Sequence, residues 1–296
     1  MLPFQEHPKL HVIRILATFE VLKSGEGPRF YFLFPLAEGN LWDFFKFMDR
    51  PTERVQRADW VAEQCFKLAT ALRLVHNERA HHIPHYIENI PDKDVELYGR
   101  HGDIKGDNVL YFESRYRRDY RLELADFGLG RLHTGISRSI QNPKGIDNSS
   151  TYRAPEFDTT SGKISRKADI FSLGCMFLEI ITWLLEGFNA AQTEFSQERL
   201  ETGLNSKFTE DTFFSLQRAP TGEISATRKA RVTGWIKRLR RCSQASDYTD
   251  QFLDFIDDRM LVPEPEGRAT SREVCSELKK MYDGCRIDSF TRPRGA

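Results

Sequence analysis

The sequence has no excess of charge of either sign. Its 296 residues include 43 lysines and arginines and 43 aspartates and glutamates, so the formal net charge is zero. Binding to nucleic acid or to an anionic membrane surface usually depends on a basic excess, and the composition gives no reason to expect either partner. We expect any electrostatic function to reside in a local cluster of charges.

Cysteine is scarce and shows no redox or metal-binding spacing. The five cysteines are an odd, scattered set without a Cys-x-x-Cys pair, which argues against a disulfide framework. The first residues also lack a basic segment followed by an apolar one, as a secretory signal would have. We therefore expect an intracellular protein, cytoplasmic or nuclear, with reduced thiols.

No apolar run is long and charge-free enough to favour a membrane span. The most apolar window, residues 170–185, is shorter than the roughly 20 residues that a spanning helix needs, and it contains Glu179. A carboxylate is costly in hydrocarbon. With 40% hydrophobic residues, the chain can bury a large core, and we predict that this window is a helix inside it.

The sequence does contain a short strand-rich start followed by helical patterns. Residues 10–22 and 29–36 are rich in β-branched and aromatic residues, and turn-forming residues 23–28 separate them; this pattern predicts a hairpin. From Trp60 to His76, apolar residues recur at helical spacing, and further helical patterns run to about Lys280. We predict an α+β fold that is mainly helical.

Four motifs follow one another along the chain. They are HGDIKGDN at 101–108, LADFG at 124–128, STYRAPE at 150–156 and SRKADIFSLGCMFLEI at 165–180. Each alone can occur by chance, but the ordered set resembles the eukaryotic protein kinase family, whose catalytic loop, Asp-Phe-Gly, Ala-Pro-Glu and core helix have this order. The resemblance covers most of the chain and implies a two-lobed kinase-like fold, with a helical C-lobe and a remnant hairpin of the N-lobe.

The resemblance implies chemical roles for four polar residues. Asp103 would accept or orient the proton of the substrate hydroxyl, and Lys105 would balance charge on the γ-phosphoryl group of ATP. Asn108 and Asp126 would hold Mg²⁺, which prefers oxygen ligands. Taken singly, these residues could equally be a helix cap, a surface charge or a turn residue.

The adenine of ATP would lie against the connection between the lobes. By resemblance, the carbonyl of Phe34 and the N–H of Leu36 would face the adenine ring, and Leu110 would lie beneath it. Pro35, between the first two, lacks an N–H, but no donor is needed at that position.

Five residues resemble architectural positions of the family. Glu156 would form an ion pair with Arg268, and Asp169 would hydrogen-bond the backbone of the catalytic loop. His101 would pack beneath Phe127 and brace the same loop. Removing one member of a buried ion pair is strongly destabilising, so we expect Glu156 and Arg268 to contribute stability and not catalysis.

The loop sequence also bears on substrate and regulation. Lys105, two residues after Asp103, resembles the serine/threonine branch, and Ser149 would bridge to both; the implied partner is a protein with serine or threonine hydroxyls. Gly102 stands where many members have an arginine that captures an activation-loop phosphate. This non-RD pattern suggests constitutive ordering of the activation segment or control by another partner.

The sequence lacks a glycine-rich loop before its first strand and the lysine and helix glutamate that hold ATP phosphates. Gly25 and Gly27 lie in the hairpin turn, after that strand. We therefore expect a fragment of a longer kinase. It would consist of an N-lobe remnant with the hinge (residues 1–36), a C-lobe (residues 37–284) and a disordered tail (residues 285–296).

Two other classes of function remain open at this stage. A pseudokinase could act as an interaction scaffold without catalysis, and a small-molecule kinase of the aminoglycoside or choline type shares the fold. Lys105 and the motifs at 152–156 and 169–174 argue against the small-molecule class.

Three further features have plain structural interpretations. We predict solvated or loop-packing histidines, and not a zinc site, for His76, His81, His82 and His85. The basic run at 228–241 has the pattern of an amphipathic helix. The polar stretch at 186–227 is expected to be a mobile insertion.

Overall fold

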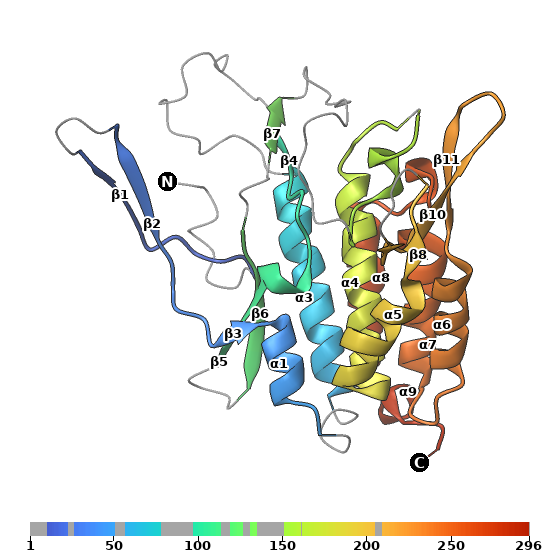
Figure 1. The fold of residues 1–296 in the computed structure, drawn as a ribbon. Coiled ribbons are helices and arrows are strands. Elements are labelled where there is room, and N and C mark those ends of the chain that lie inside the picture. The colour runs from blue at the N-terminus through green and yellow to red at the C-terminus, as the bar shows by residue number, and fades with distance from the viewer. Residues whose placement is uncertain are drawn as a thin grey trace.

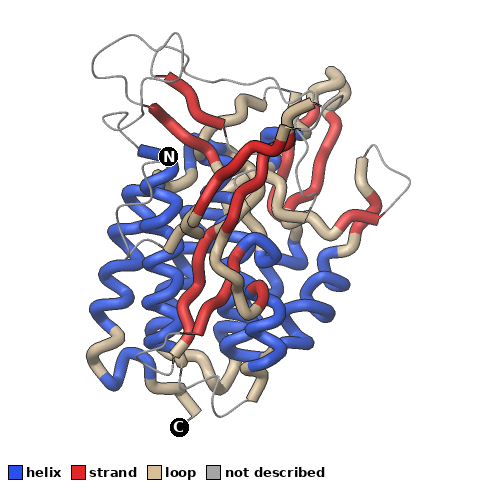
Figure 2. The backbone as a smooth tube through the Cα atoms, turned by 90° about the vertical axis from the view of Figure 1, so that its left-hand side faces the viewer, coloured by secondary structure: helices blue, strands red, loops and turns tan. Residues whose placement is uncertain are grey.

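The computed structural model describes residues 11–22, 27–50, 57–77, 97–113, 119–126, 131–134, 151–160, 162–204 and 209–295. Most strands before residue 135 lie to one side of a body of roughly parallel and antiparallel helices (Figure 1). Figure 2 shows strands crossing in front of these helices when the molecule is viewed from that side. The predicted mainly helical α+β fold is confirmed.

A two-stranded hairpin projects from the helical body (Figure 1). It consists of β1 (Ala17–Val21) and β2 (Arg29–Leu33), which pair antiparallel. Phe19 stacks on Tyr31 with ring centroids 5.4 Å apart, yet Phe19 is 52% exposed and Phe30 is 65% exposed. The predicted hairpin is therefore present, and its aromatic side chains lie outside the core.

A small sheet carries the loop that holds three of the four predicted catalytic and metal-binding residues. Its strand order is β3–β5–β6, and a separate pair is formed by β4 and β7. The strands of the sheet are β3 (Gly39–Asn40), β5 (Val109–Glu113) and β6 (Tyr120–Leu124), and those of the pair are β4 (Leu97–Arg100) and β7 (Arg131–Thr134). The N–H of Ile13 donates to the carbonyl of Leu124 at 2.8 Å, so an N-terminal segment extends this sheet beside β6.

Helix α4 (Lys167–Glu186) forms the centre of the core. All of its residues from 173 to 185 are buried, and Trp183 stacks on Phe45 with ring centroids 4.4 Å apart. Around α4 pack α1 (Leu41–Phe47), α3 (Ala58–Asn77), α6 (Ala230–Arg240), α7 (Asp247–Phe255) and α8 (Ser271–Gly284).

Within the described part of the chain, α4 is the one helix long and apolar enough to cross a membrane. Since 94% of its apolar window is buried inside the protein, length and composition are weak evidence for a span. The prediction of a buried core helix is confirmed.

The stretch after α4 is ordered where it is described, and the prediction of a mobile insertion was wrong. Its elements are a π-helical turn (Ala190–Glu194), α5 (Phe195–Arg199), the pair β8 (Glu201–Thr202) and β9 (Thr209–Glu210), and the hairpin β10 (Phe214–Arg218) and β11 (Ile224–Arg228). Phe195 and Phe213 are fully buried. These two aromatic anchors outweigh the polar composition around them, because burying each removes a large apolar area from water.

The chain after α8 was also predicted incorrectly as disordered. Residues 288–291 form a short helix, α9 (Asp288–Thr291), and Phe290 packs edge-to-face against Tyr248. The N–H groups of Arg294 and Gly295 donate to the carbonyls of Ala245 and Ser243, each at 2.9 Å. One aromatic side chain and two backbone hydrogen bonds therefore tie this segment to the loop before α7.

The basic run folds as predicted, as the amphipathic helix α6. Its apolar side chains are buried: Val232, Trp235, Ile236 and Leu239. The run is a structural helix that presents its charges on the other face.

A buried ion pair joins the segment before α4 to the turn before α8. Arg268 donates to both carboxylate oxygens of Glu156, at 2.8 and 2.7 Å, and the two side chains are 0% and 2% exposed. The same guanidinium donates to the carbonyls of Val262, Pro263 and Lys167. The predicted pair is present, and Arg268 also satisfies three backbone acceptors.

We predict that Glu156→Gln lowers the free energy of unfolding by about 3–5 kcal/mol, because it leaves the Arg268 charge buried without a counter-ion. Urea denaturation measures the change. The matched control is Glu277→Gln, which removes an exposed partner of Lys280 and should cost less than about 1 kcal/mol. Equal effects of the two substitutions would contradict the prediction.

Candidate active site

A buried carboxylate on α4 anchors the loop formed by residues 101–108. Asp169 is 2% exposed; its Oδ2 accepts the N–H of His101 at 2.8 Å, and its Oδ1 accepts the N–H of Gly102 at 2.9 Å. Hydrogen bonds to an ionised acceptor are short and strong. The two residues that immediately precede Asp103 are therefore fixed to α4, as predicted for Asp169.

His76, in the last turn of α3, completes the surroundings of this carboxylate. Its Nε2 lies 2.9 Å from Oδ2 of Asp169. Burial raises the pKa of Asp169, but hydrogen bonds from His76 and from the Gly102 N–H act against it, so this pKa lies below its ordinary value. Asp169 is therefore the anionic acceptor that the loop amides require.

The prediction of a solvated or loop-packing histidine was wrong for His76, which is 2% exposed. The packing of α3 on α4 places it against Asp169, a contact that its own neighbours in sequence do not indicate. His81, His82 and His85 lie outside the described residues. Among the described residues no group of three or more histidine, cysteine, aspartate or glutamate side chains could hold a metal.

His101 fills the space behind the loop. It is 0% exposed; its Nε2 lies 3.1 Å from the carbonyl of Ala125, and its Nδ1 accepts the N–H of Asp103 at 3.3 Å. Burial lowers the pKa of His101, so the ring is neutral and one nitrogen can accept while the other donates. The residue expected to pack on it, Phe127, lies outside the described residues.

Asp103, Lys105 and Asn108 converge within the loop. Lys105 Nζ lies 2.8 Å from Asp103 Oδ2. Asn108 Nδ2 donates to the same Oδ2 at 2.9 Å and to the Asp103 carbonyl at 2.8 Å. A carboxylate, an ammonium group and an amide therefore form one cluster, in which Asp103 is held from two sides.

Gly106 allows the loop to turn against α1. A Cβ at this position would lie 2.3 Å from the indole ring of Trp42, closer than any side chain tolerates. The short 3₁₀ turn at Gly106–Asn108 thus rests on an aromatic ring, and this contact helps to set where Asn108 points.

Asn108 and Asp126 lie near the same end of the β5–β6 ladder. Val109 pairs with Leu124, and the N–H of Ala125 donates to the carbonyl of Asn108 at 2.8 Å. Asp126 follows with a φ of 61°, a left-handed conformation that is uncommon for residues other than glycine.

The donor chemistry of these two residues fits Mg²⁺. Asn108 uses its amide nitrogen to hold Asp103, which leaves the amide oxygen as its ligand atom, and Asp126 offers a carboxylate. Magnesium is commonly held by one or two such side chains together with substrate phosphates and waters. The pair would therefore suffice only with phosphate oxygens from a nucleotide.

Of the residues expected to contact adenine, Leu110 lies on β5, the middle strand of the β3–β5–β6 sheet, and Phe34 and Leu36 lie between β2 and β3. Leu110 is half-buried and packs with Ala37 against Ile13, Phe112 and Ala125. Phe34 is 42% exposed and Leu36 is 94% exposed. For Phe34 and Leu36 the expectation concerns backbone groups, and it stays a prediction.

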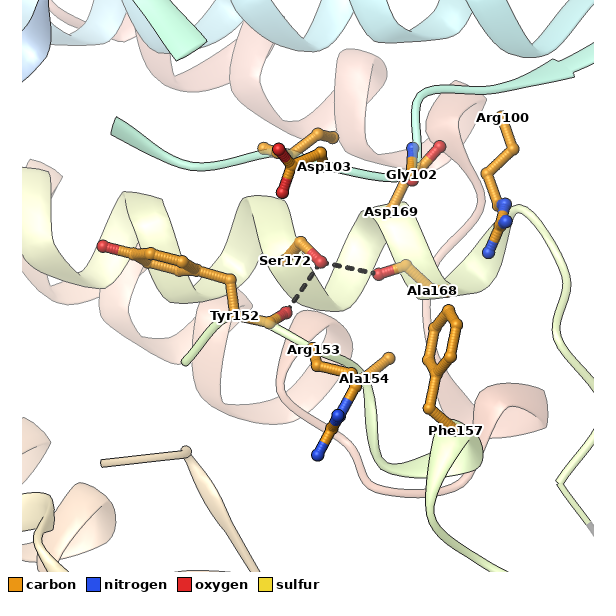
Figure 3. Close-up of a pocket in the computed structure, with 11 residues that line it drawn as sticks. Arg100, Gly102, Asp103, Tyr152, Arg153, Ala154, Phe157, Ala168, Asp169 and Ser172 are labelled. Carbon is orange, nitrogen blue, oxygen red and sulfur yellow. Dashed lines mark hydrogen bonds between the residues drawn. The ribbon is translucent and has the colours of Figure 1, made fainter. Parts of the chain in front are cut away.

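A small pocket lies between loop 101–108 and the segment 152–157 (Figure 3). Asp103 and Ile104 line one side; Tyr152, Ala154 and Phe157 line the other. In Figure 3 the Tyr152 ring extends along α4, away from Phe157. The predicted catalytic aspartate therefore borders this small hollow.

Sequence reasoning missed two residues that shape this pocket. Ser172 Oγ donates to the Tyr152 carbonyl at 2.8 Å, and the guanidinium of Arg100 lies 5.6 Å from the centre of the Phe157 ring. Ser172 is three residues after Asp169 on α4 and therefore on the same helix face, which is a signal that could have been used. No local pattern indicates the contact of Arg100. Ser149, expected to bridge to Asp103, lies outside the described residues.

Comparison with known proteins agrees with this geometry. The family model of the protein kinase domain matches residues 98–278, more than half of the chain. Two proline-rich receptor-like protein kinases of Arabidopsis thaliana are 40% identical over 86 residues and 37% identical over 82 residues. A cysteine-rich receptor-like protein kinase of the same plant is 33% identical over 90 residues.

These alignments are short relative to both partners. The first two cover 28% of this chain and the third 30%, and they cover 14%, 11% and 13% of the respective relatives. The chain therefore matches only a small part of the length of these receptor-like kinases.

We predict that Asp169→Asn speeds hydrogen exchange of the His101 and Gly102 amides by about ten- to a hundred-fold, since a hydrogen bond to a charged group contributes about 1.5–3 kcal/mol. The carboxamide oxygen of this variant can accept a hydrogen bond from only one of the two backbone N–H groups. Its NH₂ group faces the other N–H, and two donors form no hydrogen bond with each other. Exchange followed by mass spectrometry or NMR gives the rates. Asp254→Asn, at an exposed partner of Arg240, is the control; unchanged rates in Asp169→Asn would refute the anchoring role.

Proposed function

The chain belongs to the protein kinase family, and from this premise we propose that it transfers the γ-phosphoryl group of ATP to serine and threonine hydroxyls of proteins. The observation that carries the proposal is the cluster of Asp103, Lys105 and Asn108 on a loop anchored by a buried carboxylate. Phosphoryl transfer needs positioned groups and charge neutralisation, and little covalent work by the protein. This cluster provides groups of that kind.

Asp103 is the group that would orient the acceptor hydroxyl and accept its proton. Its carboxylate is held by Lys105 and Asn108, and it borders the pocket beside Tyr152. A carboxylate with a fixed orientation lowers the entropic cost of aligning a nucleophile. Asp103 needs no unusual basicity for this role, because the hydroxyl proton is lost as the phosphoryl group arrives.

Lys105 would lie beside the transferred group and balance its charge. With Mg²⁺ bound by the Asn108 side-chain oxygen and Asp126, the metal would neutralise charge on the phosphate oxygens. The Lys105 side chain is half-buried, 23% exposed, where charge–charge interactions are stronger than in bulk water. Its position two residues after Asp103 also supports serine/threonine specificity.

Gly102 removes one common route to regulation. A glycine has no side chain to bind an activation-loop phosphate, and its N–H is bonded to Asp169 instead. We propose that the segment before Glu156 is ordered by contacts other than a phosphate on an arginine at this position. The five cysteines form no disulfide, which supports an intracellular setting as part of the proposal.

We predict that the chain phosphorylates dephosphorylated casein in the presence of ATP and Mg²⁺, and that a glutamate–tyrosine copolymer is a much poorer acceptor. Asp103→Asn should lower kcat by at least about a hundred-fold, the usual contribution of a positioned general base. Asp107→Asn, an exposed carboxylate in the same loop, should leave the rate unchanged. Transfer of radiolabelled phosphate measures both.

A nucleotide-dependent melting shift separates catalysis from binding. Stabilisation by ATP with Mg²⁺ and no phosphoryl transfer would favour a nucleotide-binding scaffold. A chain that is not stabilised by ATP with Mg²⁺ and transfers no phosphate would contradict the proposed function.

A further inference from the structure

Two adjacent residues of the segment that precedes Glu156 are held by separate carboxylates. The Tyr152 hydroxyl donates to Glu179 Oε2 at 2.7 Å, and Thr151 Oγ1 donates to Asp211 Oδ1 at 2.6 Å. Glu179 belongs to α4, whereas Asp211 directly follows β9. The position of this segment therefore depends on two acceptors that are 32 residues apart in the chain.

Arg199, the last residue of α5, connects the two acceptors. Its Nη2 lies 3.2 Å from Glu179 Oε1 and 3.8 Å from Asp211 Oδ2, and its Nε donates to the Asp211 carbonyl at 3.0 Å. Because a guanidinium is planar and rigid, one side chain sets the separation of the two carboxylates.

Arg199 has little freedom to move. It is 1% exposed, and its guanidinium carbon lies 4.1 Å from the ring centroids of both Phe195 and Phe213. Lys229 Nζ also donates to the Arg199 carbonyl at 2.7 Å. The Phe195 and Phe213 rings, whose centroids are 5.6 Å apart, both lie against the cation, which limits its movement and strengthens its binding through cation–π attraction.

The buried charge of Glu179 depends on this cation. Burial raises the pKa of Glu179 to about 7, although Arg199 and the Tyr152 hydroxyl both act to lower it. Without Arg199, the carboxylate would be buried with the Tyr152 hydroxyl as its remaining hydrogen-bond donor among the described residues, and protonation would become more favourable. A protonated Glu179 could turn and donate elsewhere, which would release Tyr152.

Movement of Tyr152 would change the pocket beside Asp103. Tyr152 lines that pocket, and its backbone carbonyl is tied to α4 through Ser172 (Figure 3). The segment is thus held at three points: the Tyr152 carbonyl, the Tyr152 hydroxyl and the Thr151 hydroxyl. Two of the three depend on the carboxylates that Arg199 joins.

We propose that Arg199 is a positioning residue for the protein substrate: through Glu179 and Asp211 it fixes Thr151 and Tyr152, and so shapes the surface that receives the residues flanking the acceptor hydroxyl. The inference rests on the proposed kinase activity. It gives the insertion after α4 a role in substrate binding, which its polar sequence did not suggest.

The test compares Arg199→Met, Arg199→Lys and Arg231→Met in the full chain. Methionine keeps apolar bulk against the two rings but loses the bridge, whereas lysine keeps a charge near Glu179. Arg231 is an exposed arginine on α6 that pairs with Glu198 of α5, and it serves as the matched control. The readouts are KM for casein, KM for ATP, and deuterium uptake by residues 151–158.

We predict that Arg199→Met raises KM for casein by about ten-fold, with KM for ATP unchanged, since the bridge holds the acceptor side and not the nucleotide side. Arg199→Lys should recover part of the loss, and Arg231→Met should match the parent chain. Deuterium uptake by residues 151–158 should rise in Arg199→Met only. An unchanged casein KM, or equal changes in both KM values, would overturn the proposal.

Two further variants keep the test decisive if Arg199→Met does not fold. Thr151→Val and Asp211→Asn each remove or weaken the hydrogen bond between these two residues and should raise the casein KM in the same direction. If the parent chain transfers no phosphate at all, the proposed function fails, and the exchange of residues 151–158 still decides whether Arg199 holds the segment. Unchanged exchange would then overturn the inference on its own.

Discussion

The active-site geometry depends on one buried carboxylate, that of Asp169. A charge taken out of water is tolerated only with strong partners, and this one has two backbone N–H groups and His76. The two amides belong to His101 and Gly102, directly before Asp103. Because the buried Asp169 carboxylate requires these hydrogen bonds, it determines where the candidate catalytic loop lies relative to the core.

Helix α4 extends the same principle along its length. Near its start Asp169 holds the loop, one turn later Ser172 holds the Tyr152 carbonyl, and in its second half Glu179 holds the Tyr152 hydroxyl. The helix is otherwise an apolar core element, so these polar groups lie in a rigid, close-packed setting. The loop and Tyr152, which lie on the two sides of the pocket beside Asp103, are thus both hydrogen-bonded to α4. Their relative position cannot change without disturbing the core.

The sequence allowed prediction of features that depend on neighbouring residues or on a motif. The cluster of Asp103, Lys105 and Asn108 lies within six residues, and the Glu156–Arg268 pair follows from the family pattern. The contacts of His76 and Arg199 could not be predicted, because they depend on how α3 and α5 pack against α4 and no local periodicity encodes that packing. Polar composition misled the interpretation of residues 186–227, where two buried aromatic side chains decide the structure.

The most direct test of the account is a crystal structure of the chain with Mg²⁺ and a non-hydrolysable ATP analogue. We predict a magnesium ion about 2.0–2.1 Å from the Asn108 amide oxygen and from an Asp126 carboxylate oxygen, with Lys105 Nζ directed at the terminal phosphate and Asp103 facing the pocket beside Tyr152. A nucleotide bound with its phosphates away from loop 101–108, or a metal held without Asn108 and Asp126, would contradict the account.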